Sequence, residues 1–209
     1  MRIGLSMQFR EYGGDREVEA LIALMAKLPG LGPRSARRAV IKMIEKRKII
    51  LEPLAQVLGS VSEKITECVE CGNFSTEEIC CICSDGERQS SIMCIVQDVA
   101  DLWAMERSNV FKGIYHVLGN YSSTYSGINP EELKVDKIRT RLEKEHVEEV
   151  ILALDATING QTTAHYLIEK LQDTGAKFSS LAHGVPVGGE LDYLDDGTIR
   201  AAFTARKNV

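Results

Sequence analysis

Two Cys-x-x-Cys pairs, Cys68-Val69-Glu70-Cys71 and Cys80-Cys81-Ile82-Cys83, stand eight residues apart in the chain. Each pair lets two thiolates of one tight turn face the same point, and the loop between them returns the second pair to it. The two-residue gap to Cys83 favours Cys80 over its neighbour Cys81. The spacing therefore predicts one Zn²⁺ per chain, held by Cys68, Cys71, Cys80 and Cys83. Four thiolates leave no open position for water, so we expect the ion to be structural.

Disulfide pairing is the alternative interpretation of the same cysteines. The chain shows no secretory signal at its amino terminus, and clustered thiols in a reducing compartment favour metal binding. The loop at 72–79 is polar and has no apolar period of its own, so metal ligation would have to supply its folding free energy. Cys94 stands within an apolar run and is expected to be a core residue.

A second chemical feature is the turn Leu28-Pro29-Gly30-Leu31-Gly32-Pro33 followed by Arg34. Gly30 and Gly32 would let the backbone approach a phosphate, and the free N–H groups at the start of the next helix would point at it. Arg34 and Arg38 are four residues apart and would flank the same anion. The arrangement resembles the helix-hairpin-helix DNA-binding motif, and Arg37 and Lys42 are further candidate DNA contacts.

The charge distribution agrees with a local DNA-binding patch. Residues 27–48 contain eight basic residues and one acid, a local charge of +7, whereas the whole chain has a net charge of −5. An acidic chain is not expected to coat nucleic acid through its overall charge. The alternative is an ordinary solvated helix face, but glycines in the turn and arginines at the helix start favour phosphate binding.

Helices must position this turn. Apolar residues recur at helical spacing from residue 17 to 28, and Pro33 suits the first position of a second helix. Residues 49–67 are predicted to form a third helix that leads into the cysteines. Its predicted buried side contains five apolar residues, Leu51, Leu54, Val57, Leu58 and Val61.

From residue 92 the pattern changes to alternating strands and helices. Short apolar runs predict strands at 92–96, 113–119, 150–154 and 177–182, with helices between them, one of them charged and spanning 131–149. This alternation predicts a parallel-type sheet with helices on both sides. The segment from His183 is rich in glycine and could bind phosphate or cross between subunits. A turn is expected at 195–197, and a closing helix or tail at 201–207.

The 209 residues, with 44% hydrophobic and 26% charged content, describe an ordinary soluble protein large enough for more than one compact unit. No stretch approaches the roughly 18 apolar residues of a membrane span. We therefore expect a cytoplasmic protein without a membrane partner.

Taken together, these parts resemble the RecR family of bacterial recombination mediators. LPGLGPRSARRA, the cysteine spacing, VILALDATINGQTTAHYL and HGVPVGGELD carry the resemblance, which runs from about residue 18 to the end. It implies an α+β multidomain protein. The expected parts are a helical region with the helix-hairpin-helix at 1–66, a four-cysteine zinc finger at 67–88, an α/β Toprim domain at 89–182 and a subunit-packing segment at 183–209.

The resemblance also implies a function. Members of the family assemble as ring-shaped tetramers that clamp DNA, and they act with RecO and RecF to help load RecA onto gapped DNA coated by single-strand-binding protein. Arg34 and Arg38 match the family's DNA-contacting positions. The tail from His183 matches the segment that packs against a neighbouring subunit.

The Toprim pattern of this chain departs from that of catalytic members. Those place a Glu after the first strand and an Asp-x-Asp after a later one, because Mg²⁺ needs several carboxylate oxygens. Here the positions read Gln97 and Asp155-Ala156-Thr157, and Asn159 stands where the family commonly has a Glu. We therefore predict a non-enzymatic protein.

Two alternatives to that interpretation stay open. One is a Mg²⁺-dependent nuclease or nucleotidyl-transfer enzyme built on Asp155 and Asp98. The other is a zinc-dependent interaction module without a DNA role, against which the basic hairpin argues. The loop at 122–130 also differs from the family's form, which puts a partner contact there in doubt.

Overall fold

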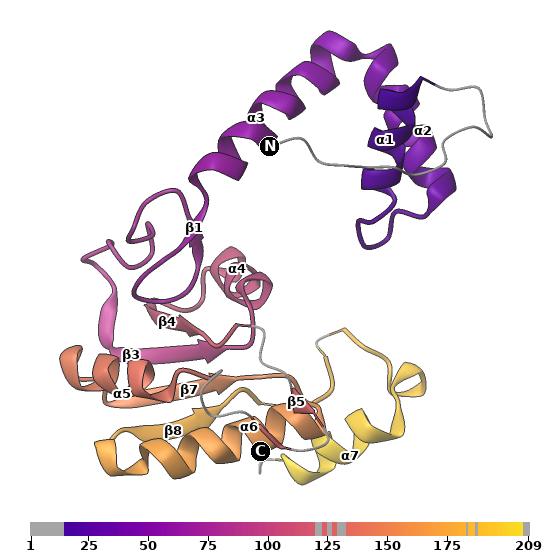
Figure 1. The fold of residues 1–209 in the computed structure, drawn as a ribbon. Helices are drawn as coiled ribbons and strands as arrows, with labels where there is room; N and C mark the ends of the chain where they lie inside the picture. The colour runs from indigo at the N-terminus through magenta and orange to yellow at the C-terminus, as the bar shows by residue number, and fades with distance from the viewer. Residues whose placement is uncertain are drawn as a thin grey trace. The chain divides into compact units, whose positions relative to one another are not determined.

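The computed structural model describes residues 15–119, 123–124, 127–128, 133–182, 184–186 and 188–206. The chain divides into two compact units between Lys64 and Ile65, and each is described by itself (Figure 1). The predictions for His183 and for much of the loop at 122–130 fall outside the described residues.

The first unit is helical. It contains α1 (Arg16–Met25), α2 (Pro33–Glu45), a π-helical turn η1 (Arg47–Leu51) and α3 (Glu52–Lys64). Ile22 of α1 packs with Ala36, Val40 and Met43 of α2 to form the core of this unit. The α2 residues follow the i, i+4, i+7 spacing of one helix face, so the helices predicted on either side of the glycine turn are confirmed.

The predicted buried side of the third helix is wrong. α3 lies within the predicted range, but none of its residues is buried. Val57 and Leu58 are each 59% exposed, and Leu54 and Val61 are also exposed. Of the five residues predicted to be buried, only Leu51, in the preceding turn, contacts the core of the unit. An amphipathic pattern identifies the face that avoids water, but it does not tell which surface covers that face.

The second unit is built on a four-stranded sheet with the order β4-β3-β7-β8. The strands are β3 (Gln89–Val96), β4 (Gly113–Val117), β7 (Glu149–Ala153) and β8 (Lys177–Ser180). All three strand pairs are parallel, with Cys94 opposite Tyr115 on one side and Ile151 on the other. The predicted parallel sheet is confirmed, and β3 begins three residues earlier than expected.

Helices cover both faces of this sheet, as predicted. They are α4 (Val99–Ser108), α5 (Val135–Lys144) and α6 (Ile158–Leu171). Met93 and Ile95 of β3 pack in one core with residues of α5 and α6. Cys94 and Val96 pack in the other core with α4 and the cysteine pairs, and Figure 1 shows α4 on the face opposite α6. This alternation follows from the two-residue period of a strand.

Short elements complete the second unit. They are two antiparallel two-stranded ribbons, β1 (Thr66–Glu67) with β2 (Phe74–Ser75) and β5 (Ser123–Thr124) with β6 (Gly127–Ile128), the 3₁₀ turns η2 (Gln172–Thr174) and η3 (Leu191–Tyr193), and α7 (Asp196–Thr204). The turn expected at 195–197 is instead the beginning of α7, because the Asp195 side chain accepts a hydrogen bond from the Thr198 N–H at 3.0 Å and caps the helix. Within the described ranges, no helix has the length and apolar character needed to span a bilayer.

Candidate metal centre and nucleic-acid interface

The four predicted cysteines come together in the second unit. Their sulfur atoms all lie within 4.8 Å of one another, and the Sγ atoms of Cys71 and Cys80 are 3.6 Å apart. Zinc–sulfur bonds of about 2.3 Å place the sulfurs of a tetrahedral site roughly 3.8 Å apart, whereas a disulfide needs about 2.05 Å. The described cysteines are free thiols, so the geometry fits a metal ion and not a disulfide. Cys81 is exposed and lies outside the group.

The surroundings of the sulfurs favour a thiolate at Cys71, whereas burial raises the pKa of Cys80. The backbone N–H of Asn73 points to the Cys71 sulfur at 3.4 Å, and that of Cys80 to the Cys68 sulfur at 3.3 Å. A hydrogen bond from Cys83 is the largest cause that lowers the pKa of Cys71 to about 5. The same hydrogen bond raises the pKa of Cys83. One thiolate is thus stabilised by the others, and four thiolates at once require a cation.

The cysteine loop (residues 68–83) is attached to the sheet by contacts that the sequence pattern does not predict. The carbonyl of Cys71 accepts a hydrogen bond from the Val117 N–H of β4 at 2.8 Å, and β4 is an edge strand whose N–H groups need acceptors. The Trp103 indole N–H of α4 donates to the buried Asn73 side chain at 3.0 Å. Spacing along the chain contains no signal for these pairs, because they join segments 30 or more residues apart.

The glycine turn of the first unit has a defined geometry. The Leu28 carbonyl accepts a hydrogen bond from the Leu31 N–H at 3.0 Å, and Gly30 has φ +78°. With Pro29 before Gly30, this is a type II turn, which favours glycine at that position. Gly32 has φ −70° and caps α2 without a side chain. A Cβ atom at Gly32 would meet nothing within 4 Å, so the backbone there is open to an approaching ligand.

The predicted basic contacts divide into two groups. Arg34 and Arg38 are exposed at the beginning of α2, and they form no ion pair with an acid in the described ranges. Arg37 is half-buried, with its guanidinium 3.5 Å from Glu19 of α1, and Lys42 lies 2.9 Å from Glu45. Ser35, which the sequence analysis did not select, lines a shallow depression with Arg38 and Lys42.

The polar residues of the Toprim pattern follow two neighbouring strands. Gln97 and Asp98 come after β3, and Asp155 comes after β7, which pairs with β3 through Val96 and Ala153. The Asp98 side chain caps α4 by accepting a hydrogen bond from the Asp101 N–H at 3.1 Å. The Asp101 side chain in turn accepts a hydrogen bond from the Asp98 N–H at 3.2 Å.

Asp101 is a carboxylate that the sequence analysis missed, although an acid three residues after a cap is a signal for it. Burial, and then the charges of Asp98 and Asp155, raise its pKa. In the part of the chain that the structure describes, the four cysteines alone form a group of three or more ligand side chains close enough to hold a metal.

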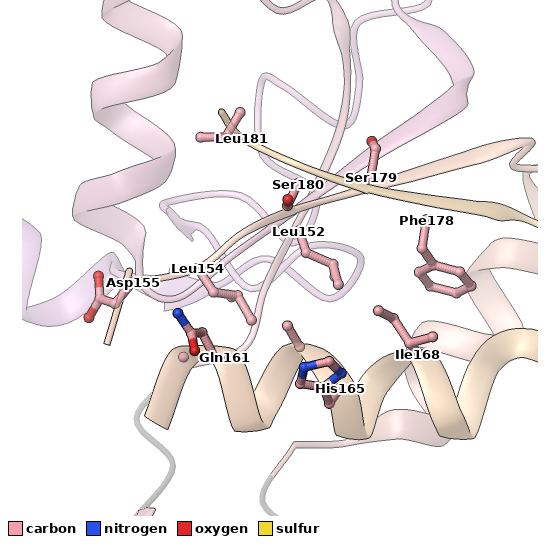
Figure 2. A pocket seen from close by; sticks show the side chains of 12 residues that line it. Leu152, Leu154, Asp155, Gln161, His165, Ile168, Phe178, Ser179, Ser180 and Leu181 are labelled. Carbon is pink, nitrogen blue, oxygen red and sulfur yellow. The ribbon is translucent and has the colours of Figure 1, made fainter. Parts of the chain in front are cut away.

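Asp155 also lies at one end of a cavity of about 290 Å³ between α6 and the strands β7 and β8. Figure 2 shows Gln161, His165 and Ile168 of α6 facing the strands, with Phe178 at the other end. A Cβ atom at Gly160 would lie 2.0 Å from the Asp155 carbonyl oxygen, so a glycine is needed where α6 passes this loop. The cavity walls are largely apolar, and Asp155 is the single carboxylate among its lining residues in the described chain.

Comparisons with known proteins agree in all parts of the chain. The family model for "RecR, helix-hairpin-helix" matches residues 18–61, the one for the Toprim domain matches 91–182, and the one for "RecR, C-terminal" matches 184–207. Recombination protein RecR of Ruegeria sp. (strain TM1040) is 58% identical over 193 residues, which cover 92% of this chain and 96% of the relative. Recombination protein RecR of Jannaschia sp. (strain CCS1) is 56% identical over 194 residues, which cover 93% and 98%.

Proposed function

Because the chain belongs to the RecR family of recombination proteins, which act in DNA repair, we propose that it is a non-enzymatic DNA clamp. The observation that carries the proposal is the pair of exposed arginines, Arg34 and Arg38, at the start of α2 behind an open glycine turn. The helix N-terminus provides N–H groups for a phosphate oxygen, and the two guanidinium groups provide the charge.

Binding of this kind does not read bases. Contacts to phosphate position the protein on DNA without sequence information, and each neutralised phosphate makes the affinity fall with salt. We therefore propose sequence-independent, salt-sensitive binding. The intrinsic affinity should be modest, because residues outside the basic segment are strongly acidic.

The test compares the parent with an Arg34→Ala/Arg38→Ala variant in DNA titrations at increasing salt. We expect at least a tenfold loss of affinity and a salt slope smaller by roughly 1.4 to 1.8, since each lost phosphate contact contributes about 0.7 to 0.9. The matched control is Arg107→Ala/Arg200→Ala, which removes the same charge from exposed positions of the second unit. Equal affinity and equal slope in the hairpin variant and the parent would remove the hairpin from the mechanism.

The clamp should be a homo-oligomer, in the form of a tetrameric ring. The apolar side of α3 supports self-association, because Val57 and Leu58 are exposed on it and an unpartnered apolar helix face favours burial against another chain. Exposed Leu191, Tyr193 and Phe203 support a second contact through the tail.

RecO and RecF are the proposed protein partners, and the proposed site of action is gapped DNA in the cytoplasm, where the clamp would help to load RecA. A purified mixture tests this role. RecA filament formation on gapped DNA coated by single-strand-binding protein should accelerate when this chain is added with RecO, and it should not accelerate with the Arg34→Ala/Arg38→Ala variant.

The cysteine group is proposed to hold one structural Zn²⁺ through Cys68, Cys71, Cys80 and Cys83. Their sulfur spacing and hydrogen bonds support this assignment. A bound zinc ion would offset part of the thiolate charge and stabilise the segment between β1 and β3, whose cysteines form one core with the sheet.

The competing function is a Mg²⁺-dependent nuclease or nucleotidyl-transfer activity built on Asp155 and Asp98. The neutral side chains of Gln97 and Asn159 argue against it, and Asp98 already uses an oxygen to cap α4. Incubation with nicked, gapped and single-stranded DNA plus Mg²⁺ or Mn²⁺ separates the two functions. Cleavage or ligation that an Asp155→Asn variant lacks would establish the enzyme.

A further inference from the structure

In the second unit, another cavity lies at the carboxyl end of β4. Its volume is about 650 Å³. Its walls come from the end of β4 and the residues after it, the beginnings of α4 and α5, and the segment from β1 to β2. The polar side chains that line it are His116, Lys134 and Lys137 together with the acids Glu67 and Asp98.

Basic residues stand at the beginning of α5 and along it. Lys134 is the exposed residue directly before the helix, with φ +48°, and Lys137 and Arg141 are four residues apart, so they lie on one side of the helix. The Arg141 guanidinium is buried, and its Nη1 donates to the Tyr115 carbonyl of β4 at 2.6 Å. The two lysines precede it in the chain and line the cavity.

His116 is a polar side chain held in a buried strand position. It is 3% exposed, and its Nδ1 lies 3.5 Å from Nη1 of Arg141. A guanidinium only donates hydrogen bonds, so Nδ1 faces it with a lone pair and the ring proton belongs on Nε2. Burial, and then the charges of Arg141, Lys137 and Lys134, lower the pKa of His116 to about 3. At neutral pH the ring is therefore an uncharged N–H donor beside three cations.

The acids around this cluster balance it only in part. Glu70 lies 3.7 Å from Arg141 and 2.9 Å from Lys144. Lys134 and Lys137 form no ion pair with any acid whose position the structure gives. Glu67 and Asp98 line the same cavity but belong to β1 and to the loop before α4. Among the residues whose positions the structure gives, the α5 side of the cavity thus has two lysines without an ion-paired acid and one neutral N–H donor.

We propose that His116, Lys134 and Lys137 form a binding site for a phosphate group. Two ammonium groups would supply charge, and the His116 N–H would supply a fixed hydrogen bond from the cavity wall. The phosphate belongs either to the backbone of DNA held by the clamp or to a free phosphate or nucleotide. Both sources present the same chemical group. They differ in the effect that the Lys134→Gln/Lys137→Gln substitutions have on DNA binding.

The first experiment uses inorganic phosphate and the full-length chain. Thermal unfolding is measured as phosphate replaces chloride at constant ionic strength, for the parent, a Lys134→Gln/Lys137→Gln variant and a Lys170→Gln/Lys177→Gln control of equal net charge. We expect phosphate to raise the Tm of the parent and the control but not that of the Lys134→Gln/Lys137→Gln variant. The His116 imidazole nitrogen signal should shift with phosphate in the parent and in the control, but not in the Lys134→Gln/Lys137→Gln variant.

The second experiment identifies the source. In chains that already contain Arg34→Ala/Arg38→Ala, residual binding of single-stranded DNA is measured with and without Lys134→Gln/Lys137→Gln. A DNA backbone source predicts a loss of roughly threefold to tenfold and a salt slope smaller by about 1.4, for two contacts on a single strand. Unchanged DNA binding with intact phosphate stabilisation assigns the site to free phosphate or a nucleotide. If phosphate stabilises the Lys134→Gln/Lys137→Gln variant as much as the parent and leaves the His116 signal in place, the proposal is wrong, and the function proposed for the hairpin is unaffected.

Discussion

Two glycines of one turn are needed for different physical reasons. Gly30 has a positive φ that side chains disfavour, whereas Gly32 has an ordinary φ and open space in front of it. The first glycine is therefore a requirement of the fold. The second would be a requirement of the proposed ligand, because a missing side chain lets a phosphate come close to the backbone.

Substitution by alanine should separate these two reasons. We expect Gly30→Ala to lower the free energy of unfolding by about 1 to 2 kcal/mol, measured by chemical denaturation. Gly32→Ala should cost about 0.5 to 1 kcal/mol, because alanine is a poorer N-cap residue than glycine, and it should weaken DNA binding in fluorescence titrations. A Gly32→Ala variant that binds DNA as well as the parent would show that no phosphate reaches this backbone.

Substitution of single cysteines tests which of them bind the metal. Cys68→Ala or Cys83→Ala should release the metal and destabilise the second unit by several kcal/mol, because the binding free energy of a structural ion is folding free energy. Cys81→Ser should keep the metal, since Cys81 is exposed and outside the group. Elemental analysis of the purified variants gives the zinc content, expected to be about one ion per parent chain. Zinc loss in Cys81→Ser with retention in Cys80→Ser would reverse the assignment of ligands.

At the scale of elements, α3 is a helix whose apolar side is left uncovered by the described residues of its unit. Its apolar side chains are exposed, and burying a side chain of this size in a partner interface contributes roughly 1.5 to 3 kcal/mol. A Val57→Glu/Leu58→Glu variant should therefore shift the assembly toward smaller species in analytical ultracentrifugation.

The flank of the same helix supplies the control. Gln56→Glu/Ser60→Glu adds the same charge, on average about a third of a turn away from the centre of the apolar side, and should leave the mass unchanged. Equal masses for both variants and the parent would show that self-association does not use the apolar side of α3.

The contact between the cysteine loop and α4 is a second feature at the scale of elements. Trp103→Phe keeps an aromatic ring but removes the indole N–H that donates to Asn73. The buried side-chain oxygen of Asn73 then lacks its hydrogen-bond donor. We expect a loss of about 1 to 3 kcal/mol and faster zinc release to a chelator, followed by absorbance. Unchanged release kinetics would mean that the sheet contact through Cys71 and Val117 is sufficient to hold the loop.

At the scale of the whole molecule, charge and assembly are coupled. The basic segment 27–48 has a charge of +7 within a chain of net charge −5, so a single chain attracts DNA weakly. Several hairpins in one assembly would bind the same strand with a high effective concentration.

Affinity should then depend on assembly even when the hairpin is intact. We expect the Val57→Glu/Leu58→Glu variant to bind single-stranded DNA at least tenfold more weakly than the Gln56→Glu/Ser60→Glu control, measured by fluorescence anisotropy at equal chain concentration. Arg34 and Arg38 are the same in both variants. Identical affinities for the smaller and larger species would exclude cooperation between hairpins.

The sequence alone was sufficient to predict the features that depend on short spacings along the chain. Paired cysteines, the glycine turn before Pro33 and the apolar runs of β3, β4, β7 and β8 are set by residues close together in the chain. Their geometry follows from local backbone preferences and from the periods of helix and strand. For the same reason the spacing alone distinguishes Cys80 from Cys81 as the predicted partner of Cys83.

Only the tertiary structure decided which distant segments lie against one another. It showed that α3 exposes its apolar side, that Asn73 bonds to Trp103, and that His116 of β4 meets Arg141 of α5. Such contacts depend on which elements become neighbours in the fold. Side-chain periodicity indicates the side of a helix or strand that avoids water, but the partner on that side is determined by the packing of the whole unit.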